Sequence, residues 1–167
     1  MANTWRATAG GVAFAATKDM LNIFNGGAAT RVIRARRAYQ FNNGTIAVTG
    51  VLTTMQIRRL TAASLGTAVT PVAHDTTNSA LEAALTAGTG QTVTGSDIFR
   101  RYLWSNDEPT VSLATQDEWE LLVPNAEVWN AGYGDTAVQP IVCRANQGFE
   151  IFHSGATVVG ANDFEIE

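Results

Sequence analysis

The sequence predicts an all-β protein, specifically a jelly-roll-like β-sandwich of about eight strands with one short helix and an insertion. Short apolar runs alternate with polar residues, and turn residues recur at roughly eight to twelve positions, which is typical of sandwiches and barrels. Strands do not alternate with helices, so a parallel βαβ arrangement is not expected. A chain of 167 residues is long enough for one domain with a substantial core.

Composition and charge favour a protein that contacts neighbours. Charged residues make up only 16% of the chain, against about 25% in an ordinary soluble domain. Residues 1–101 hold ten basic and four acidic residues, a charge of +6, and residues 102–167 hold one basic and eleven acidic residues, a charge of −10. This split favours contacts between opposite charges, either inside one subunit or between subunits. A plain soluble β domain with small polar surface residues is the alternative.

The first half of the chain predicts an arm followed by strands. Residues 1–19 are rich in Ala, Thr and Gly, with Trp5 and Phe14 as isolated large groups, and predict an N-terminal arm. Trp5 is the natural anchor if this arm docks on another surface. Residues 20–167 are then expected to form a single β-sandwich domain. Its first strand candidates are 20–24, 31–41, 45–48, 51–60 and 69–72.

The helix and the insertion are expected in the middle of the chain. Ala80, Leu81, Ala84 and Leu85 have helical spacing, with Asp75 as a candidate N-cap, so residues 74–86 predict one short helix. A Gly-, Thr- and Ser-rich stretch follows, and an insertion is expected at about 86–118. Residues 98–104 fit a strand or a helical turn. The later strand candidates are 111–113, 119–123, 127–129, 138–144, 149–153 and 163–167.

No catalytic constellation is visible, so the sequence predicts no enzyme, no cofactor and no metal site. The only cysteine is Cys143, in an apolar run typical of a buried residue, and with His74 and His153 it cannot form a Cys/His zinc site. His153 is expected at a turn. The acidic pair Asp117 and Glu118 is expected in a solvated loop, and a hydrolase that uses this pair is the least supported alternative.

Arginines give the clearest surface signal. Arginine outnumbers lysine ten to one, and its planar fork suits carboxylates at interfaces. Rows of outward arginines on neighbouring strands repel each other unless acids meet them; those acids are expected from the C-terminal half or from a partner. The acidic C-terminal half argues against direct nucleic-acid binding. The predicted partner-binding residues are Trp5, Arg34, Arg36, Arg37, Arg58 and Arg59.

Tryptophans offer a second kind of surface. Trp104 is flanked by Ser105 and Asn106 and is the one expected to be exposed, which makes it a possible ligand-binding residue. Trp119 and Trp129 lie in predicted strands and are expected in the core. An exposed Trp104, or Tyr133, would favour a carbohydrate- or receptor-binding module.

Residues 39–80 resemble the small jelly-roll structural proteins of tailed bacteriophages. The matching features are the Arg-Ala-Tyr strand that ends in Asn-Asn-Gly, the runs Val-Thr-Gly-Val-Leu-Thr-Thr and Ile-Arg-Arg-Leu-Thr-Ala-Ala-Ser, and Thr-Ala-Val-Thr-Pro-Val-Ala-His-Asp-Thr. The segments 148–152 and 163–167 look like the closing strands of that type. The resemblance covers about half of the chain and rests on small-residue patterns.

The resemblance implies a virion structural protein, a capsid cement or decoration protein. Such a protein binds the outside of the major capsid protein shell, stabilises it and is a homo-oligomer; it is made in the host cytoplasm and resides on the outer capsid surface. The chain shows no signal peptide and no apolar stretch of membrane-spanning length, so no membrane partner is expected. The alternative is a carbohydrate- or receptor-binding jelly roll of a phage tail or fibre.

Overall fold

The computed structural model describes residues 3–27, 30–42, 51–64, 66–105, 126–131, 139–156 and 158–167. This part of the chain is all β, which confirms the predicted fold class, and it contains thirteen strands and no helix. The strands are β1 (Trp5–Ala13), β2 (Lys18–Asn25), β3 (Ile33–Ala35), β4 (Arg37–Asn42), β5 (Leu52–Ser64), β6 (Thr67–Val69), β7 (Val72–Ala73), β8 (Leu85–Thr89), β9 (Thr92–Ser105), β10 (Glu127–Asn130), β11 (Ile141–Cys143), β12 (Gln147–His153) and β13 (Ala161–Ile166).

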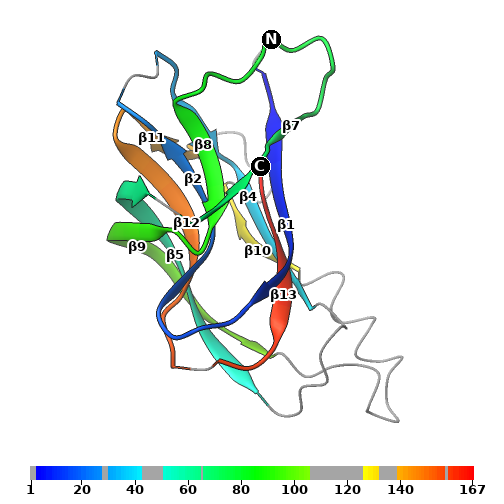
Figure 1. Ribbon diagram of the computed structural model, residues 1–167, viewed down its shortest axis with the longest axis vertical. Coiled ribbons are helices and arrows are strands. Elements are labelled where there is room, and N and C mark those ends of the chain that lie inside the picture. Colours follow the sequence, from blue (N-terminus) through cyan, green and yellow to red (C-terminus); the bar gives the residue numbers. More distant parts are fainter. Residues whose placement is uncertain are drawn as a thin grey trace.

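Two antiparallel sheets form the layers of the sandwich. One has the strand order β10-β4-β13-β1-β7, the other has the order β6-β8-β2-β12-β5-β9, and β11 and β3 make a separate pair. Figure 1 shows the two sheets side by side. Neighbouring strands are often distant in sequence, as in β12 with β2 and β13 with β1. Pairing between distant segments is what a sandwich requires, since each sheet must gather strands from the whole chain.

The predicted N-terminal arm is corrected by the structure, because β1 is an inner strand of its own sheet. It pairs with β13 through Ala7 opposite Ile166 and Ala9 opposite Phe164, and with β7 at Trp5 and Arg6. Ala7 and Ala9 are buried although they are small. Because these side chains are small, the alternation of apolar and polar residues did not indicate a strand here. In the structure the same small side chains let the backbone of β1 lie close to the opposite sheet. The sandwich therefore includes residues 5–13, which the arm prediction left outside it.

The predicted helix at 74–86 is also wrong, since this segment contains a turn and the start of β8. The Asp75 carboxylate accepts hydrogen bonds from the Thr77 backbone N–H and hydroxyl at 2.9 and 2.7 Å. The Asn78 N–H donates to the Asp75 carbonyl. Asp75 therefore caps a turn of the Asx type instead of a helix. Leu85, which completes the helical pattern, begins β8 opposite Asn25 in β2.

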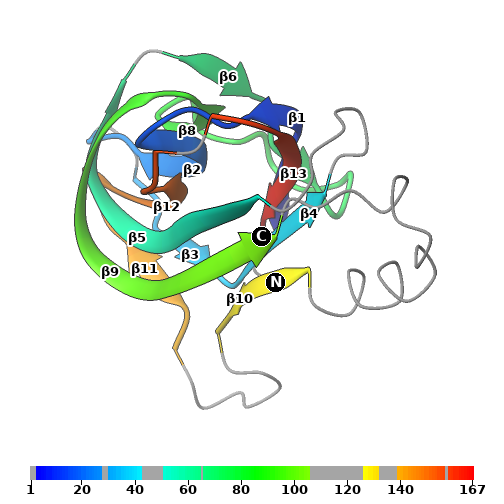
Figure 2. The same ribbon diagram turned by 90° about the horizontal axis from the view of Figure 1, so that it is seen from below.

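The predicted insertion is sheet in the part that the structure describes. Residues 86–105 contain most of β8 and all of β9, and β9 pairs with β5 over nearly its whole length, with three shifts of register. Figure 2 shows these two long strands curving around β8, β2 and β12. The remainder of the insertion, 106–118, and the predicted strands at 45–48 and 119–123 lie outside the described residues.

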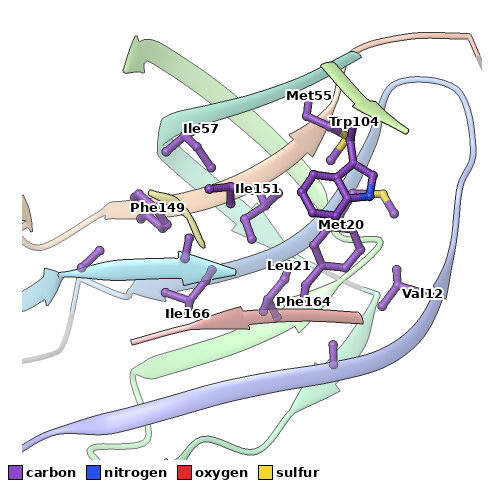
Figure 3. Close-up of a cluster of buried hydrophobic side chains, with 14 of the residues drawn as sticks. Val12, Met20, Leu21, Met55, Ile57, Trp104, Phe149, Ile151, Phe164 and Ile166 are labelled. Carbon is purple, nitrogen blue, oxygen red and sulfur yellow. The ribbon is translucent and has the colours of Figure 1, made fainter. Parts of the chain in front are cut away.

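The main core lies between the two sheets and contains Trp104. Figure 3 shows its indole projecting among buried side chains, beside Met20 and Met55. Only 9% of Trp104 is exposed, and its Nε1–H donates to Asn42 Oδ1 at 2.6 Å. The structure thus corrects the prediction of an exposed, ligand-binding Trp104. Cys143 is fully buried, as its apolar run predicts.

We expect Trp104→Ala to destabilise the protein by about 3–5 kcal/mol, because it opens a cavity in the core and leaves Asn42 without this donor. Urea unfolding measured by circular dichroism gives the free energy of unfolding. The neighbouring Leu103 is 66% exposed, so Leu103→Ala serves as the control and is expected to cost less than about 0.5 kcal/mol. Equal effects of the two substitutions would contradict this assignment of Trp104 to the core.

Candidate binding site

A pocket of about 410 Å³ opens where the start of β1 meets β3, β8 and the end of β13. Three of the predicted partner-binding residues line it together: Trp5, Arg34 and Arg36. The other lining residues are Asn3, Thr4, Ala7, Ile23, Arg31, Val32, Ile33, Pro71, Leu81, Leu85, Thr86, Ile166 and Glu167. The fold therefore gathers residues from both ends and the middle of the chain around one opening.

Local structure explains how the two arginines reach the pocket. Ala35 in β3 is fully buried while Arg34 and Arg36 on either side are exposed, since successive side chains of an extended chain point to opposite faces. β3 is held by β11, with Arg34 opposite Val142. The Arg36 backbone N–H donates to the Glu167 carbonyl at 2.7 Å. The Arg36 carbonyl accepts from the Ala131 N–H at 2.8 Å. Both arginines are thus carried on a backbone fixed by hydrogen bonds.

The inner wall of the pocket is apolar. Ile23 and Ile33 are partly buried against the core, and Ile166 is buried. Trp5 begins β1 opposite Ala73 in β7 and is itself partly buried. The pocket thus combines an apolar interior with guanidinium groups at its opening.

Neighbouring charges neutralise some of the lining residues but not Arg34 and Arg36. Arg31 Nε lies 3.0 Å from Glu82 Oε1, and Glu167 is paired with Arg6 at 3.7 Å. Within the residues that the structure describes, Arg34 and Arg36 have no acidic partner. The described residues of the opening consequently carry an excess of positive charge, and carboxylates are the groups that guanidinium forks bind best in proteins.

The remaining predicted arginines lie elsewhere. Arg37 is exposed on β4 and approaches Glu127 at 4.0 Å. Arg58 and Arg59 project from β5, and only 16% and 19% of their side chains are exposed. Their placement corrects the prediction that these two bind a partner.

Arg58 and Arg59 bind groups of their own chain instead. Arg58 pairs with Glu150 and lies 3.4 Å from the centre of the Phe152 ring. Arg59 donates to the Val142 carbonyl at 2.8 Å and approaches Asp97 at 3.4 Å. Glu150 comes from the acidic C-terminal half and Arg58 from the basic first half. Their contact therefore joins the two halves of the sequence within one chain.

Glu150 has a second polar neighbour besides Arg58. This neighbour is Asp19, whose carboxyl group is hydrogen-bonded to that of Glu150. Glu150 is fully buried and Asp19 almost so. Asp19 Oδ2 accepts from the Asn22 amide at 2.8 Å and from the Gln91 N–H at 3.1 Å. Its Oδ1 and Glu150 Oε2 are buried and find no donor unless the two carboxyl groups share a proton.

Burial accounts for the protonation of this pair. It raises the pKa of Glu150 to about 8 and that of Asp19 to about 6, while the charge of Arg58 lowers both. The Asp19–Glu150 hydrogen bond further raises the Glu150 pKa and lowers that of Asp19, so Glu150 holds the proton. Glu150 is fully buried and Asp19 almost so, and neither carboxyl group reaches the surface.

The other titratable candidates in the described part of the chain are Cys143, His74 and His153. Burial raises the pKa of the Cys143 thiol to about 11, which keeps it protonated and unreactive. His74 is exposed. His153 is buried, and its Nδ1 lies 2.8 Å from the Ala15 carbonyl, which corrects its expected place at a turn. Tyr133, Asp117 and Glu118 lie outside the described residues.

Metal and membrane sites are not found in the part of the chain that the structure describes. There, no three His, Cys, Asp or Glu side chains gather closely enough to hold a metal ion. Nor does any helix in that part have the length and apolar character needed to span a membrane.

Comparison of the chain with protein-family profiles, with curated proteins and with solved structures finds no match. The case for the site therefore rests on its geometry. Sequence reasoning missed Arg31 in the lining and the Asp19–Glu150 pair. The segment 149–152 reads Phe-Glu-Ile-Phe, and apolar residues on both faces of one strand are the signal of a doubly buried strand, in which an acid needs a partner.

The buried pair predicts that stability falls as pH rises from about 6 to 9. The folded state keeps a proton that the unfolded chain releases, so the contribution is complete below the ordinary carboxyl pKa and is lost as pH passes about 8. We expect a loss of about 2–3 kcal/mol over this range in urea unfolding, and a flatter profile for Glu150→Gln.

Glu82→Gln is the matched control for that experiment. Hydrogen bonds from Thr30 lower the pKa of Glu82, so this group is already ionised throughout the range. The control is expected to keep the wild-type slope. A wild-type stability that is constant between pH 6 and 9 would rule out the shared proton.

Proposed function

We propose that this chain is a virion structural protein, a capsid cement or decoration protein that binds the outside of a major capsid protein shell and stabilises it. The observation that carries the proposal is the grouping of Trp5, Arg34 and Arg36 around one pocket with excess positive charge. The major capsid protein is proposed as the partner because residues 39–80 resemble small jelly-roll proteins of tailed bacteriophages.

Binding, as opposed to catalysis, is what the described groups support. The buried carboxyl pair is sealed, the thiol is protonated, and the pocket offers guanidinium forks, an indole and an apolar wall. Tryptophan and arginine are the residue types that contribute most to protein–protein interfaces. If many copies bound one shell, each through weak contacts, the multivalent attachment of the protein to the shell would be strong.

Self-association is a further part of the proposal, supported by a small apolar surface on β5 and β9. Leu52 and Leu103 are 59% and 66% exposed. Leu103 lies opposite Thr54, and Leu52 opposite Ser105, so both leucines project from the same face of the strand pair. Adjacent exposed leucines favour contact with another protein surface. A homo-oligomer on the outer capsid surface, made in the host cytoplasm and without direct nucleic-acid contact, fits this arrangement.

The tail- or fibre-module alternative loses its main residue because Trp104 is buried. Tyr133, the other residue of that alternative, lies outside the described residues.

A binding experiment tests the proposal. Purified wild-type protein is expected to sediment with expanded capsids that lack it and to raise the temperature at which those capsids lose their contents. Protein unfolded by heat is the control and is expected to do neither. Absence of binding, or capsids that are equally heat-resistant with and without the protein, would show that this function is not the right one.

A further inference from the structure

We infer that the pocket lined by Trp5, Arg34 and Arg36 is a binding site for an extended peptide segment that alternates acidic and apolar side chains. Its carboxylates would bind the two guanidinium groups, and its apolar side chains would enter the pocket. The chemistry of the segment follows from the pocket, whereas its assignment to the capsid protein rests on the proposed function.

The charge of the opening selects an anionic partner. Arg34 and Arg36 have no acid among the described residues, while Glu167 in the lining is paired with Arg6 and Arg31 is paired with Glu82. Opposite charges steer association and exclude partners of the same sign. We therefore expect the two exposed guanidinium groups at the pocket to bind carboxylates of a partner.

The spacing of the arginines selects an extended chain. Arg34 and Arg36 are two residues apart on either side of buried Ala35. Alternate residues of an extended backbone rise by about 6.6–6.8 Å, so carboxylates at alternate positions of an extended peptide match the two guanidinium groups. A helical segment would place its carboxylates three or four residues apart.

The apolar part of the pocket selects the residues between the acids. Its volume of about 410 Å³ lies within the range of roughly 300–1,000 Å³ that is usual for ligand pockets. Ile23, Leu85 and Pro71 line it, and Trp5 offers a flat ring. Inorganic phosphate would leave this space unfilled, and a single fatty-acid carboxylate would leave one arginine unused. An acidic–apolar peptide uses both features.

Calorimetric titration with two blocked peptides tests the inference. The probes are acetyl-Asp-Leu-Glu-Leu-Asp-amide and its neutral counterpart acetyl-Asn-Leu-Gln-Leu-Asn-amide, with octanoate and inorganic phosphate as further ligands. We expect the acidic peptide to bind the wild-type protein at least tenfold more tightly than the neutral one, and more weakly as salt is raised. Equal affinity for the two peptides, no binding of either, or binding of octanoate or phosphate alone would overturn the inference.

Variants locate the binding within the molecule. The double substitution R34A/R36A is expected to weaken the acidic peptide at least tenfold, and R34K/R36K to weaken it less, because lysine keeps the charge but not the fork. Arg101→Ala is the control, since Arg101 is also exposed but lies on β9. Unchanged affinity in R34A/R36A, or the same loss in Arg101→Ala, would place the peptide elsewhere and overturn the inference.

Two further measurements separate this inference from the proposed function and from self-association. If wild-type protein and R34A/R36A bind capsids equally, the pocket is not the capsid contact, although the proposed function stands. If wild-type protein binds the acidic peptide but no capsid, the proposed function fails and the pocket chemistry stands. A wild-type oligomer that becomes monomeric in R34A/R36A by sedimentation would make a second copy the occupant and overturn the capsid assignment.

Discussion

The fold depends on β12, which is buried on both of its faces. On one side Phe149 and Ile151 enter the core between the sheets, and on the other Glu150 pairs with Arg58 beneath the curved strands β5 and β9. An acid can be buried there only if its charge is met or removed, and both happen: Arg58 lies beside Glu150, and Asp19 shares its proton. Gly95 opposite Leu60 leaves room for this arginine, because a Cβ at this position would lie 2.5 Å from Arg58 Nε.

That internal pairing determines which charges remain for a partner. The C-terminal half supplies acids to Arg6, Arg37 and Arg58 through Glu165, Glu127 and Glu150. Among the described residues, acids of the C-terminal half therefore meet basic residues of the first half within the sandwich. Among the described residues at the pocket, Arg34 and Arg36 are the basic groups without an acidic partner, so the positive charge there is local even though the chain as a whole is acidic.

The sequence allowed the all-β class and the buried Cys143 to be anticipated, because period-two alternation and residue chemistry are local properties, whereas the grouping of Trp5 with Arg34 and Arg36 appears only in the structure. It did not reveal that β1 is an inner strand, since Ala7 and Ala9 carry almost no hydrophobic signal. The turn at Asp75 resembled a helix start because the same carboxylate can cap either structure. Arg58 and Glu150 are distant in sequence, so only the pairing of β5 with β12 shows that they lie opposite each other.

The two arginine groups illustrate why residue type alone does not define a binding surface. Arg58 and Arg34 are both strand residues in arginine-rich stretches, yet one is covered by β9 and the other lies at an opening. The difference is topological: β5 is an inner strand of a curved sheet, whereas β3 belongs to a two-stranded pair. Arg34 on the short pair is exposed, whereas Arg58 on the curved six-stranded sheet is only 16% exposed. The location of the candidate site thus follows from where the sheets end, which is set by strand order and not by charge pattern.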